Sequence, residues 1–310
     1  MPHLRSLLLT LALGLFTGLL PMPEATAQKL PFNTVFKGTE RFDRLLKEAR
    51  EKNWAALPLG DRTVAVGLAL CGTPYKGHTL EIHNHIEAPS VNFYGMDCWT
   101  FFEIALNFAR MLDLPPARQT PQTLLKLIEI ERYRGGKCDG SYISRIHFLE
   151  ELFYDNEKRG LLTNITRSLG GVRIHRRISY MSNGWRDYRY LRHNPSLRPQ
   201  MAQVERRVSA LPVYYIPKSK VAGIEPKLRN GDIIAIVGSA NGSYTTHVGL
   251  AYRDKSGVLR FMHATSAKGK GRQCIVDSRL RDYLFASKKR AGIIVARPNP
   301  LPPAIAASLR

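Results

Sequence analysis

The chain has 310 residues, with 46 lysines and arginines against 25 aspartates and glutamates, and a formal net charge of +21 at pH 7. This length buries a sizeable core, as one large domain or two small ones. A charge this large indicates an acidic partner, and it is not by itself informative about the fold. The four cysteines, Cys71, Cys98, Cys138 and Cys274, have no C-x-x-C spacing, which argues against a disulfide scaffold or a zinc knuckle.

The first 27 residues have the features of a secretory signal peptide. Arg5 precedes an apolar run from Leu7 to Leu20, and residues 25–27 form an A-x-A cleavage site. We expect cleavage before Gln28, because the apolar run is short for a membrane anchor. No second long apolar segment follows, so we expect the mature chain to have no transmembrane segment and to be periplasmic or extracellular. Its acidic partner is then the anionic envelope, an envelope polymer or extracellular nucleic acid.

Capping residues and apolar periodicity predict helices in the first half of the chain. Thr39 caps a helix that runs to about Asn53, and Asp61 caps a shorter one over residues 62–71. The alternation of apolar residues in the second segment also suits a strand. Thr120 and Pro121 start a further helix that ends before residue 135.

Another helix is predicted from about Ser144, with an apolar stripe at Ile146, Leu149, Leu152 and Phe153. Between residues 173 and 207 arginines alternate with aromatic residues. Such interleaving suits nucleic acid or a glycan, but an ordinary solvated surface explains it equally well.

Short strands dominate the last third of the chain. Apolar runs cover residues 232–237, 246–252, 259–265 and 291–297, and turn-forming residues separate them. Short turns favour antiparallel pairing, and helices followed by a sheet indicate an α+β fold.

Cys98 lies in the first turn of a predicted helix. Asp97 is a good N-cap, and the stripe of apolar residues that follows is Phe101, Ala105, Phe108, Ala109 and Leu112. The free amides and the dipole at a helix start favour a thiolate and face an oxyanion, which suits a cysteine nucleophile. The alternative is a small buried hydrophobic residue.

Two histidines lie on neighbouring predicted strands. In a hairpin symmetric about Lys255, His247 and His263 are directly opposite each other, about 5 Å apart, on the same face. One histidine then accepts the thiol proton and the other orients it, as in a catalytic triad. The alternatives are structural histidines, or a metal site formed with Cys98, which lacks any short-range ligand pair.

Four short motifs in this chain order resemble the NlpC-type papain-like cell-wall cysteine peptidases. They are G-T-P-Y at 72–75, D-C at 97–98, H-V-G at 247–249 and H-A at 263–264. More narrowly, DCWTFFE, SYISRIHFLEELFYDN and the GDIIAIV, HVGLAY and FMHAT series resemble a bacterial N-acetylmuramoyl-L-alanine amidase-like family. The resemblance covers the chain from about Leu70 to Pro298.

The resemblance implies a papain-like α+β fold, with N-terminal helices packed on a C-terminal antiparallel sheet, and a single catalytic domain over residues 28–310. It also implies Cys98 as the nucleophile, His247 as the general base and His263 as the orienting residue. No cofactor is implied. Residues 173–207 form a basic insertion that the superfamily pattern does not explain.

Three further residues are candidates for substrate binding. Tyr75 and Asp97 match positions that the wider superfamily uses around the substrate, although a turn aromatic and a plain helix cap explain them equally well. Arg145 matches only the narrower family's motif, and its alternative is a solvated helix face.

The resemblance therefore implies an exported cysteine amidase or endopeptidase that cleaves an amide bond of the peptidoglycan stem through an acyl-enzyme. Peptidoglycan or its fragments are the expected partner, anionic envelope polymers are a further candidate, and nucleic acid is not expected. The alternatives are a related acyltransferase or lipid-acting thiol hydrolase, because the same triad serves other acyl groups, and a basic envelope-binding module with an inert thiol.

Overall fold

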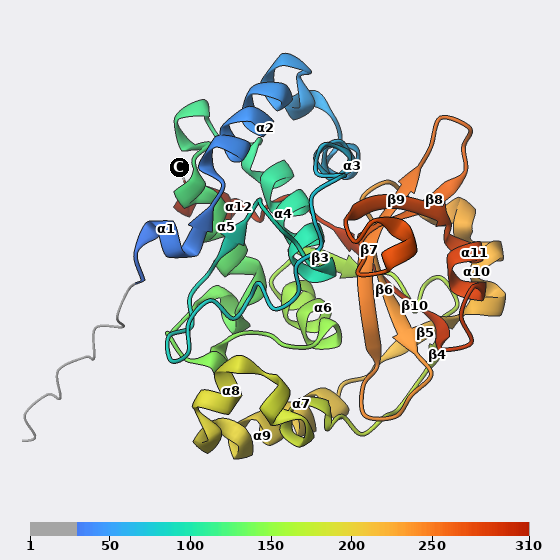
Figure 1. The fold of residues 1–310 in the computed structure, drawn as a ribbon. Helices are drawn as coiled ribbons and strands as arrows, with labels where there is room; N and C mark the ends of the chain where they lie inside the picture. The colour runs from blue at the N-terminus through green and yellow to red at the C-terminus, as the bar shows by residue number, and fades with distance from the viewer. Residues whose placement is uncertain (1–29, 310) are drawn as a thin grey trace, which may run out of the picture.

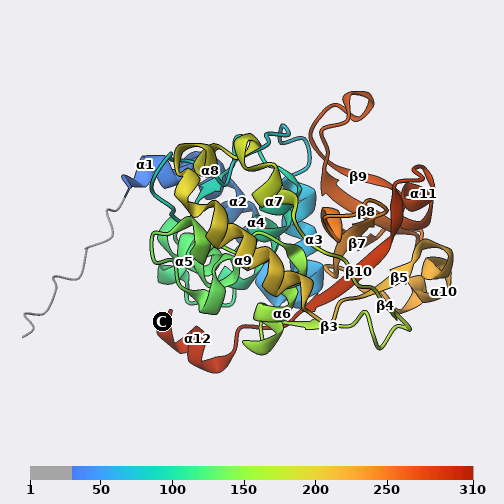
Figure 2. The ribbon, with the colours of Figure 1, turned by 90° about the horizontal axis from the view of Figure 1, so that it is seen from below.

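An antiparallel sheet divides the molecule, with a large helical layer on one face and two short helices on the other (Figures 1 and 2). The computed structural model describes residues 30–309, so the expected signal peptide lies outside the described residues. This arrangement confirms the predicted α+β fold, with N-terminal helices packed on a C-terminal antiparallel sheet.

The helical layer comes from the first half of the chain. Its helices are α1 (Phe32–Val35), α2 (Thr39–Glu51), α3 (Leu59–Ala69), α4 (Cys98–Met111), α5 (Pro121–Arg132) and α6 (Leu149–Lys158). The predicted cap of α5 is confirmed, because the Thr120 side chain accepts from the backbone N–H of Thr123. The α2 helix has Gly38 as its N-cap, so Thr39 is already its first residue.

Two of the predicted helices begin elsewhere. The α3 helix starts at Leu59, which puts Asp61 in its first turn and excludes the strand alternative. The helix expected from Ser144 begins only at Leu149, after a 3-10 turn at Tyr142–Ser144. The chain between this 3-10 turn and α6 is extended because Arg145 forms a β-bridge with Tyr133 and buries its side chain.

The main sheet has the strand order β4-β5-β10-β6-β7-β8-β9, and β3 pairs with β10. Its strands are β3 (Leu162–Asn164), β4 (Val172–Arg173), β5 (Tyr214–Pro217), β6 (Ile233–Gly238), β7 (Thr245–Arg253), β8 (Leu259–Ala264), β9 (Cys274–Arg279) and β10 (Arg290–Pro298). Every pair in this sheet is antiparallel. The four predicted strands correspond to β6, β7, β8 and β10, whereas β9 was not predicted. A small parallel pair, β1 (Phe36–Lys37) and β2 (Val91–Asn92), lies in the helical layer.

Both faces of the central strands are apolar. On β6, Ile233 and Val237 contact the core shared with α4, while Ile234 and Ile236 face a second core. That second core is covered by α10 (Val221–Ile224) and α11 (Leu280–Phe285). The α4 helix packs directly on β7 and β8, so the start of α4 meets the strands that carry the two histidines.

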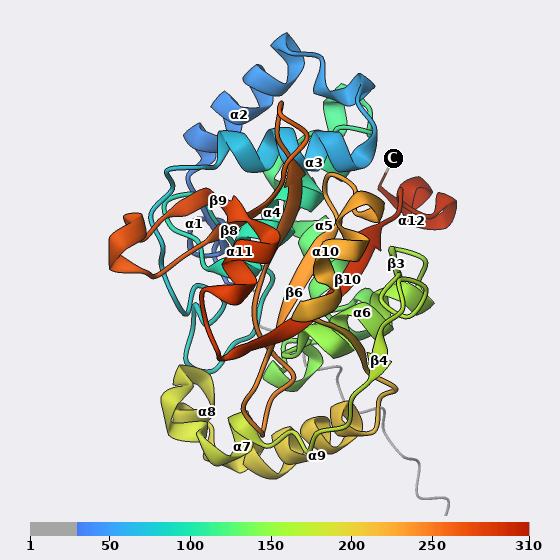
Figure 3. The same ribbon diagram turned by 90° about the vertical axis from the view of Figure 1, so that its right-hand side faces the viewer.

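The basic segment, residues 173–207, lies below the helical layer (Figures 1 and 3). Its helices are α7 (Tyr180–Asn183), α8 (Arg189–His193) and α9 (Arg198–Ser209), and the last helix of the chain is α12 (Pro303–Ser308). Within residues 30–309, no helix has the length and apolar character needed to cross a membrane.

Candidate active site

Cys98 is the first residue of α4, as predicted. Asp97 accepts from the backbone N–H of Thr100 at 2.8 Å, and the Thr100 hydroxyl accepts from the backbone N–H of Asp97 at 3.0 Å. This reciprocal capping box fixes the entry of the chain into the helix, and with it the position of the thiol.

Burial and the neighbouring Asp97 carboxylate disfavour the thiolate form of Cys98. Burial raises its pKa to about 12, and the Asp97 carboxylate adds to the rise. Hydrogen bonds from the backbone of Val248, Trp99 and Cys98 itself oppose this increase. The amides at the helix start therefore lower the pKa of the thiol, as expected, but burial raises it by more.

The predicted register of the β7–β8 hairpin is wrong by two residues. Leu250 pairs with Met262 and Arg253 with Leu259, so the hairpin is centred on residue 256 rather than on 255. Gly257, with φ of +77°, closes the turn in a left-handed conformation that favours glycine. The error moves His263 from the position opposite His247 to a diagonal one.

The two histidines nevertheless touch, because a shift of two residues keeps both on the same face of the sheet. His247 Nε2 lies 2.7 Å from His263 Nδ1, and diagonal neighbours are within reach of ring side chains. Gly249 makes room for this contact. A Cβ at that position would lie 2.8 Å from the Cβ of His263 and 2.4 Å from the carbonyl oxygen of Met262.

Asp277 on β9 contacts the inner histidine of this pair and extends it to a chain of three residues. Its Oδ2 lies 3.0 Å from Nε2 of His263 and also contacts the ammonium group of Lys270. Sequence reasoning missed Asp277. The available signal was a single carboxylate in the short apolar run C-I-V-D-S, because a buried carboxylate requires a partner.

The hydrogen-bond chain fixes the tautomers of both rings. Ionised Asp277 only accepts, so His263 carries its proton on Nε2 and accepts at Nδ1. His247 then donates from Nε2, which leaves its Nδ1 unprotonated. The assignment follows from the partners of each nitrogen. The His247–His263–Asp277 chain thereby presents a free basic nitrogen.

Burial favours the neutral form of both rings. It lowers the pKa of His247 to about 3, with the neighbouring His263 and Arg290 adding to the decrease and Asp277 opposing it. Burial also lowers the pKa of His263, again against Asp277. Burial alone would raise the pKa of Asp277, but hydrogen bonds from His263 and Lys270 hold it below its usual range.

Cys98 and His247 line one cavity of about 470 Å³ at the start of α4. Tyr75, Asp97 and Arg145 line it as well, so five of the six predicted site residues meet there. The sixth, His263, lies behind His247 and is 1% exposed.

A sequence model of a family described as N-acetylmuramoyl-L-alanine amidase-like matches residues 65–293. The chain belongs to this family.

Solved structures support this relationship. An N-acetylmuramoyl-L-alanine amidase from Bacteroides uniformis superimposes on the amidase-like chain with a TM-score of 0.70 and 28% identity, covering 78% of this chain and 99% of that one. A Bacteroides fragilis protein provisionally named a xylanase has a TM-score of 0.67 and 33% identity, covering 75% and 99%. A Legionella pneumophila protein, at 20% identity and a TM-score of 0.60, covers 85% and 97% and shares the fold. No curated protein sequence matches the chain.

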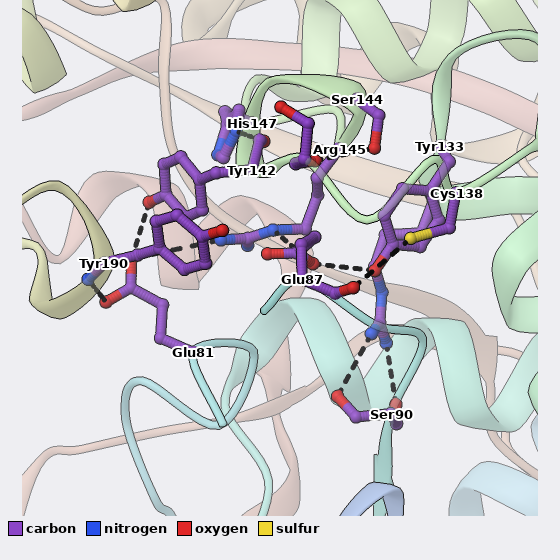
Figure 4. A network of polar contacts seen from close by, with 12 residues as sticks. Glu81, Glu87, Ser90, Tyr133, Cys138, Tyr142, Ser144, Arg145, His147 and Tyr190 are labelled. Atoms are coloured by element: carbon purple, nitrogen blue, oxygen red, sulfur yellow. Dashed lines mark hydrogen bonds and ion pairs between the residues drawn. The ribbon is translucent and has the colours of Figure 1, made fainter. Parts of the chain in front are cut away.

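In this amidase-like protein Arg145 is buried rather than on a solvated helix face (Figure 4). Its Nε lies 3.2 Å from Glu87, and its guanidinium lies 4.8 Å from the centre of the Tyr142 ring. Tyr142 donates to Glu81, and Tyr133 donates to Glu87. The network joins the chain around residues 81–87 to the turn before α6, and so forms one wall of the cavity.

Three buried N–H donors of this wall have no hydrogen-bond partner within residues 30–309. They are Nε and Nη2 of Arg145, which lie 3.2 Å from Glu87 and 3.9 Å from Glu81, and Nε1 of Trp99. Both residues line the cavity, but these three atoms are closed off from solvent. Unpaired buried donors are costly.

Asp97 and Tyr75 have structural roles in the same cavity. Both carboxylate oxygens of Asp97 are engaged, one by Thr100 and the other by the Thr79 hydroxyl at 3.3 Å. Tyr75 forms a β-bridge with Met96, and burial raises its pKa to about 12, with the neighbouring Cys98 and Asp97 side chains adding to the rise. Its hydroxyl therefore remains a donor at neutral pH.

The metal-site alternative does not fit the amidase-like site. Both ring nitrogens of His263 are engaged, one by His247 and the other by Asp277. Within residues 30–309, no group of three His, Cys, Asp or Glu side chains is arranged to hold a metal ion.

Proposed function

We propose that the protein is an exported cysteine hydrolase that cleaves an amide bond of the peptidoglycan stem. The observation that carries this proposal is that Cys98, at the start of α4, and His247, at the end of the His247–His263–Asp277 chain, line one cavity. Membership of the amidase-like family supports the bond type. Export rests on the apolar leader of the sequence, and the relationship to papain-like peptidases rests on the order of the four motifs.

In the proposed acylation step, Sγ of Cys98 attacks the amide carbonyl carbon. The thiol proton passes to the unprotonated Nδ1 of His247, since the thiol does not ionise on its own at neutral pH. The helix-start amide of Cys98 supplies part of the oxyanion hole in this proposal. His247 then protonates the leaving amine, and a thioester on Cys98 remains.

Deacylation repeats the proton transfer with water. His247 accepts a proton from a water molecule, whose oxygen attacks the thioester carbonyl, and the proton passes to the departing thiolate. The products are a carboxylic acid and the regenerated enzyme. His263 acts as a positioning residue that holds the ring of His247 in the required tautomer, with Asp277 behind it.

The cavity wall suits an amide-rich substrate. Tyr75 lines the cavity and offers a hydroxyl donor for a carbonyl oxygen. Glycoside hydrolysis, by contrast, needs two carboxyl groups facing the scissile bond. The carboxylates in this lining, Glu81 and Asp97, already accept from Tyr142, Thr100 and Thr79. We therefore do not extend the xylanase name to this chain.

Digestion of purified peptidoglycan, with the products identified by mass, tests the proposal. A free stem peptide that begins with L-alanine identifies an amidase, and fragments cut within the peptide identify an endopeptidase. The matched control is Cys98→Ala. Release of either product by that variant, or no release by the wild-type protein, contradicts the cysteine hydrolase. Transfer of the acyl group to an added amine would favour the acyltransferase alternative.

A further inference from the structure

The basic segment, residues 173–207, has nine arginines and only two acidic residues, Asp187 and Glu205. The arginines are Arg173, Arg176, Arg177, Arg186, Arg189, Arg192, Arg198, Arg206 and Arg207. Within the described part of the chain, none of them forms an ion pair. Their charge is therefore available to a partner.

Three of these arginines surround a second cavity. Arg177, Arg198 and Arg206 are exposed and line a hollow of about 740 Å³ between α7 and α9, which we call the arginine groove. Glu205 also belongs to its lining, but its Oε1 accepts from the backbone N–H of Met181 at 2.6 Å. One carboxylate against three guanidinium groups leaves the groove positively charged.

The α7 helix separates the arginine groove from the cavity of Cys98. Tyr180 and Met181 line the cavity of Cys98, whereas Ser182 and Asn183 line the groove. An α-helix with its side chains is only about 10 Å across, so the two hollows are one helix apart. A polymeric substrate held at Cys98 therefore passes within reach of the groove.

We propose that the arginine groove binds carboxylate groups of the stem peptides next to the one being cut. The guanidinium fork matches a carboxylate with two parallel hydrogen bonds, and arginine stays charged at every working pH. This inference rests on the proposed function, because peptidoglycan is the polymer that places repeated carboxylates beside an amide bond held at Cys98. The basic segment then selects polymer over single fragments.

The test measures binding of the Cys98→Ala variant to purified sacculi by co-sedimentation. In that background we compare the triple variant Arg177→Gln, Arg198→Gln and Arg206→Gln with a control triple, Arg44→Gln, Lys47→Gln and Arg118→Gln. The control removes the same charge from α2 and the adjoining turn, at the opposite end of the molecule (Figures 1 and 3). We expect roughly tenfold weaker binding for the groove triple, as for three exposed ion pairs, and less than a twofold change for the control.

A second arm uses sacculi whose carboxyl groups have been converted to amides. They should bind the Cys98→Ala protein as weakly as native sacculi bind the groove triple. Equal binding of native and amidated sacculi, or an equal loss in the control triple, would overturn the proposal. Arginine-to-lysine changes at the same three sites retain the charge and should give an intermediate loss. If thermal unfolding shows that the glutamine triple is misfolded, the lysine triple is compared with the control instead.

The two proposals fail separately. Binding is measured without turnover, so weak binding of the groove triple supports the groove even if the wild-type protein releases no product from peptidoglycan. Conversely, release of product together with full binding by the groove triple would retain the hydrolase and discard the groove.

Discussion

Two buried carboxylates, one in each half of the molecule, are used in opposite ways. Glu103 in α4 accepts from Nε and Nη2 of Arg132 at 3.0 and 2.7 Å, and both side chains are fully buried. Asp277 in β9 accepts from His263, whose other nitrogen contacts His247 at the edge of the cavity. The first pair is closed within the helical layer, whereas the second is the inner end of a chain that reaches the cavity lined by Cys98.

The difference indicates what each half contributes. The helical layer holds α4, which carries Cys98, with paired charges, and Arg110 with Glu131 at 3.0 Å forms a second buried pair about two turns further along α4. In the proposed mechanism the sheet contributes the base, His247, and the residues that control its protonation. Loss of the Glu103 carboxylate should therefore lower the stability of the protein, whereas loss of the Asp277 carboxylate should lower the reaction rate.

The largest loss of activity is expected on removal of Cys98 or His247, the residues that the helical layer and the sheet each contribute to the cavity. Cys98→Ala and His247→Ala should each reduce product release from peptidoglycan by on the order of 10⁴-fold or more, and the double variant by no more than either one, because the residues act as a unit. Thermal unfolding should remain close to that of the wild type. Retained turnover in either variant would break the proposed link between the halves.

The next effect is on stability in the helical layer. Glu103→Leu leaves the buried guanidinium of Arg132 without its counter-charge, with hydrogen bonds to Ser90 alone, and should lower the free energy of unfolding by roughly 3–5 kcal/mol, measured by urea denaturation. The double variant with Arg132→Met should recover most of the loss. As a control, Glu48→Gln removes the exposed partner of Lys52 and should cost less than about 1 kcal/mol. Equal losses at the two sites would remove the distinction.

A smaller effect is expected on the sheet side. Asp277→Leu removes the acceptor that fixes the tautomer of His263 and should lower kcat by roughly 10- to 100-fold, as outer partners of functional histidines do. Asp277→Asn should cost less, because its amide oxygen still accepts from Nε2. KM should change little in both variants. A loss of stability without a loss of kcat would make Asp277 a structural residue like Glu103.

The smallest effect concerns pH. The base His247 has its pKa lowered to about 3, so it remains unprotonated above that value, and Cys98, with a pKa raised to about 12, remains a thiol below it. The pH profile of kcat/KM should therefore be nearly flat between about pH 5 and 8. Activity should fall only as pH drops toward the pKa of His247. An acid limb near 6.5, the ordinary value for histidine, would contradict the burial of the ring.

Local signals predicted much of the fold and part of the candidate site. The caps at Asp97 and Thr120 depend on residues within one helical turn, so the sequence was sufficient for them. The register of β7 and β8 depends on how the chain turns at Gly257, and a symmetric hairpin was the wrong choice. The shared face of His247 and His263 remained correct because strand faces alternate with a period of two.

Other parts of the site depend on distant contacts. Asp277 contacts His263 only because β9 pairs with β8. β9 is as long as β8, but its sequence CIVDSR has only three apolar residues, so it did not stand out as a strand. The extended chain at Arg145 likewise depends on Glu81 and Glu87, which are more than fifty residues earlier. The arginine groove needs α7 and α9 packed together, and composition alone gave only the excess of charge.

The order of the proposed catalytic residues along the sequence also separates them in time during synthesis. Cys98 is synthesised early, but the proposed base and the residues behind it follow only at positions 247–277. At roughly 5–20 residues per second, the ribosome needs about 10 to 35 s to cover that interval. A growing chain therefore carries Cys98 before the His247–His263–Asp277 chain can form, and that chain is completed only when β9 joins the sheet.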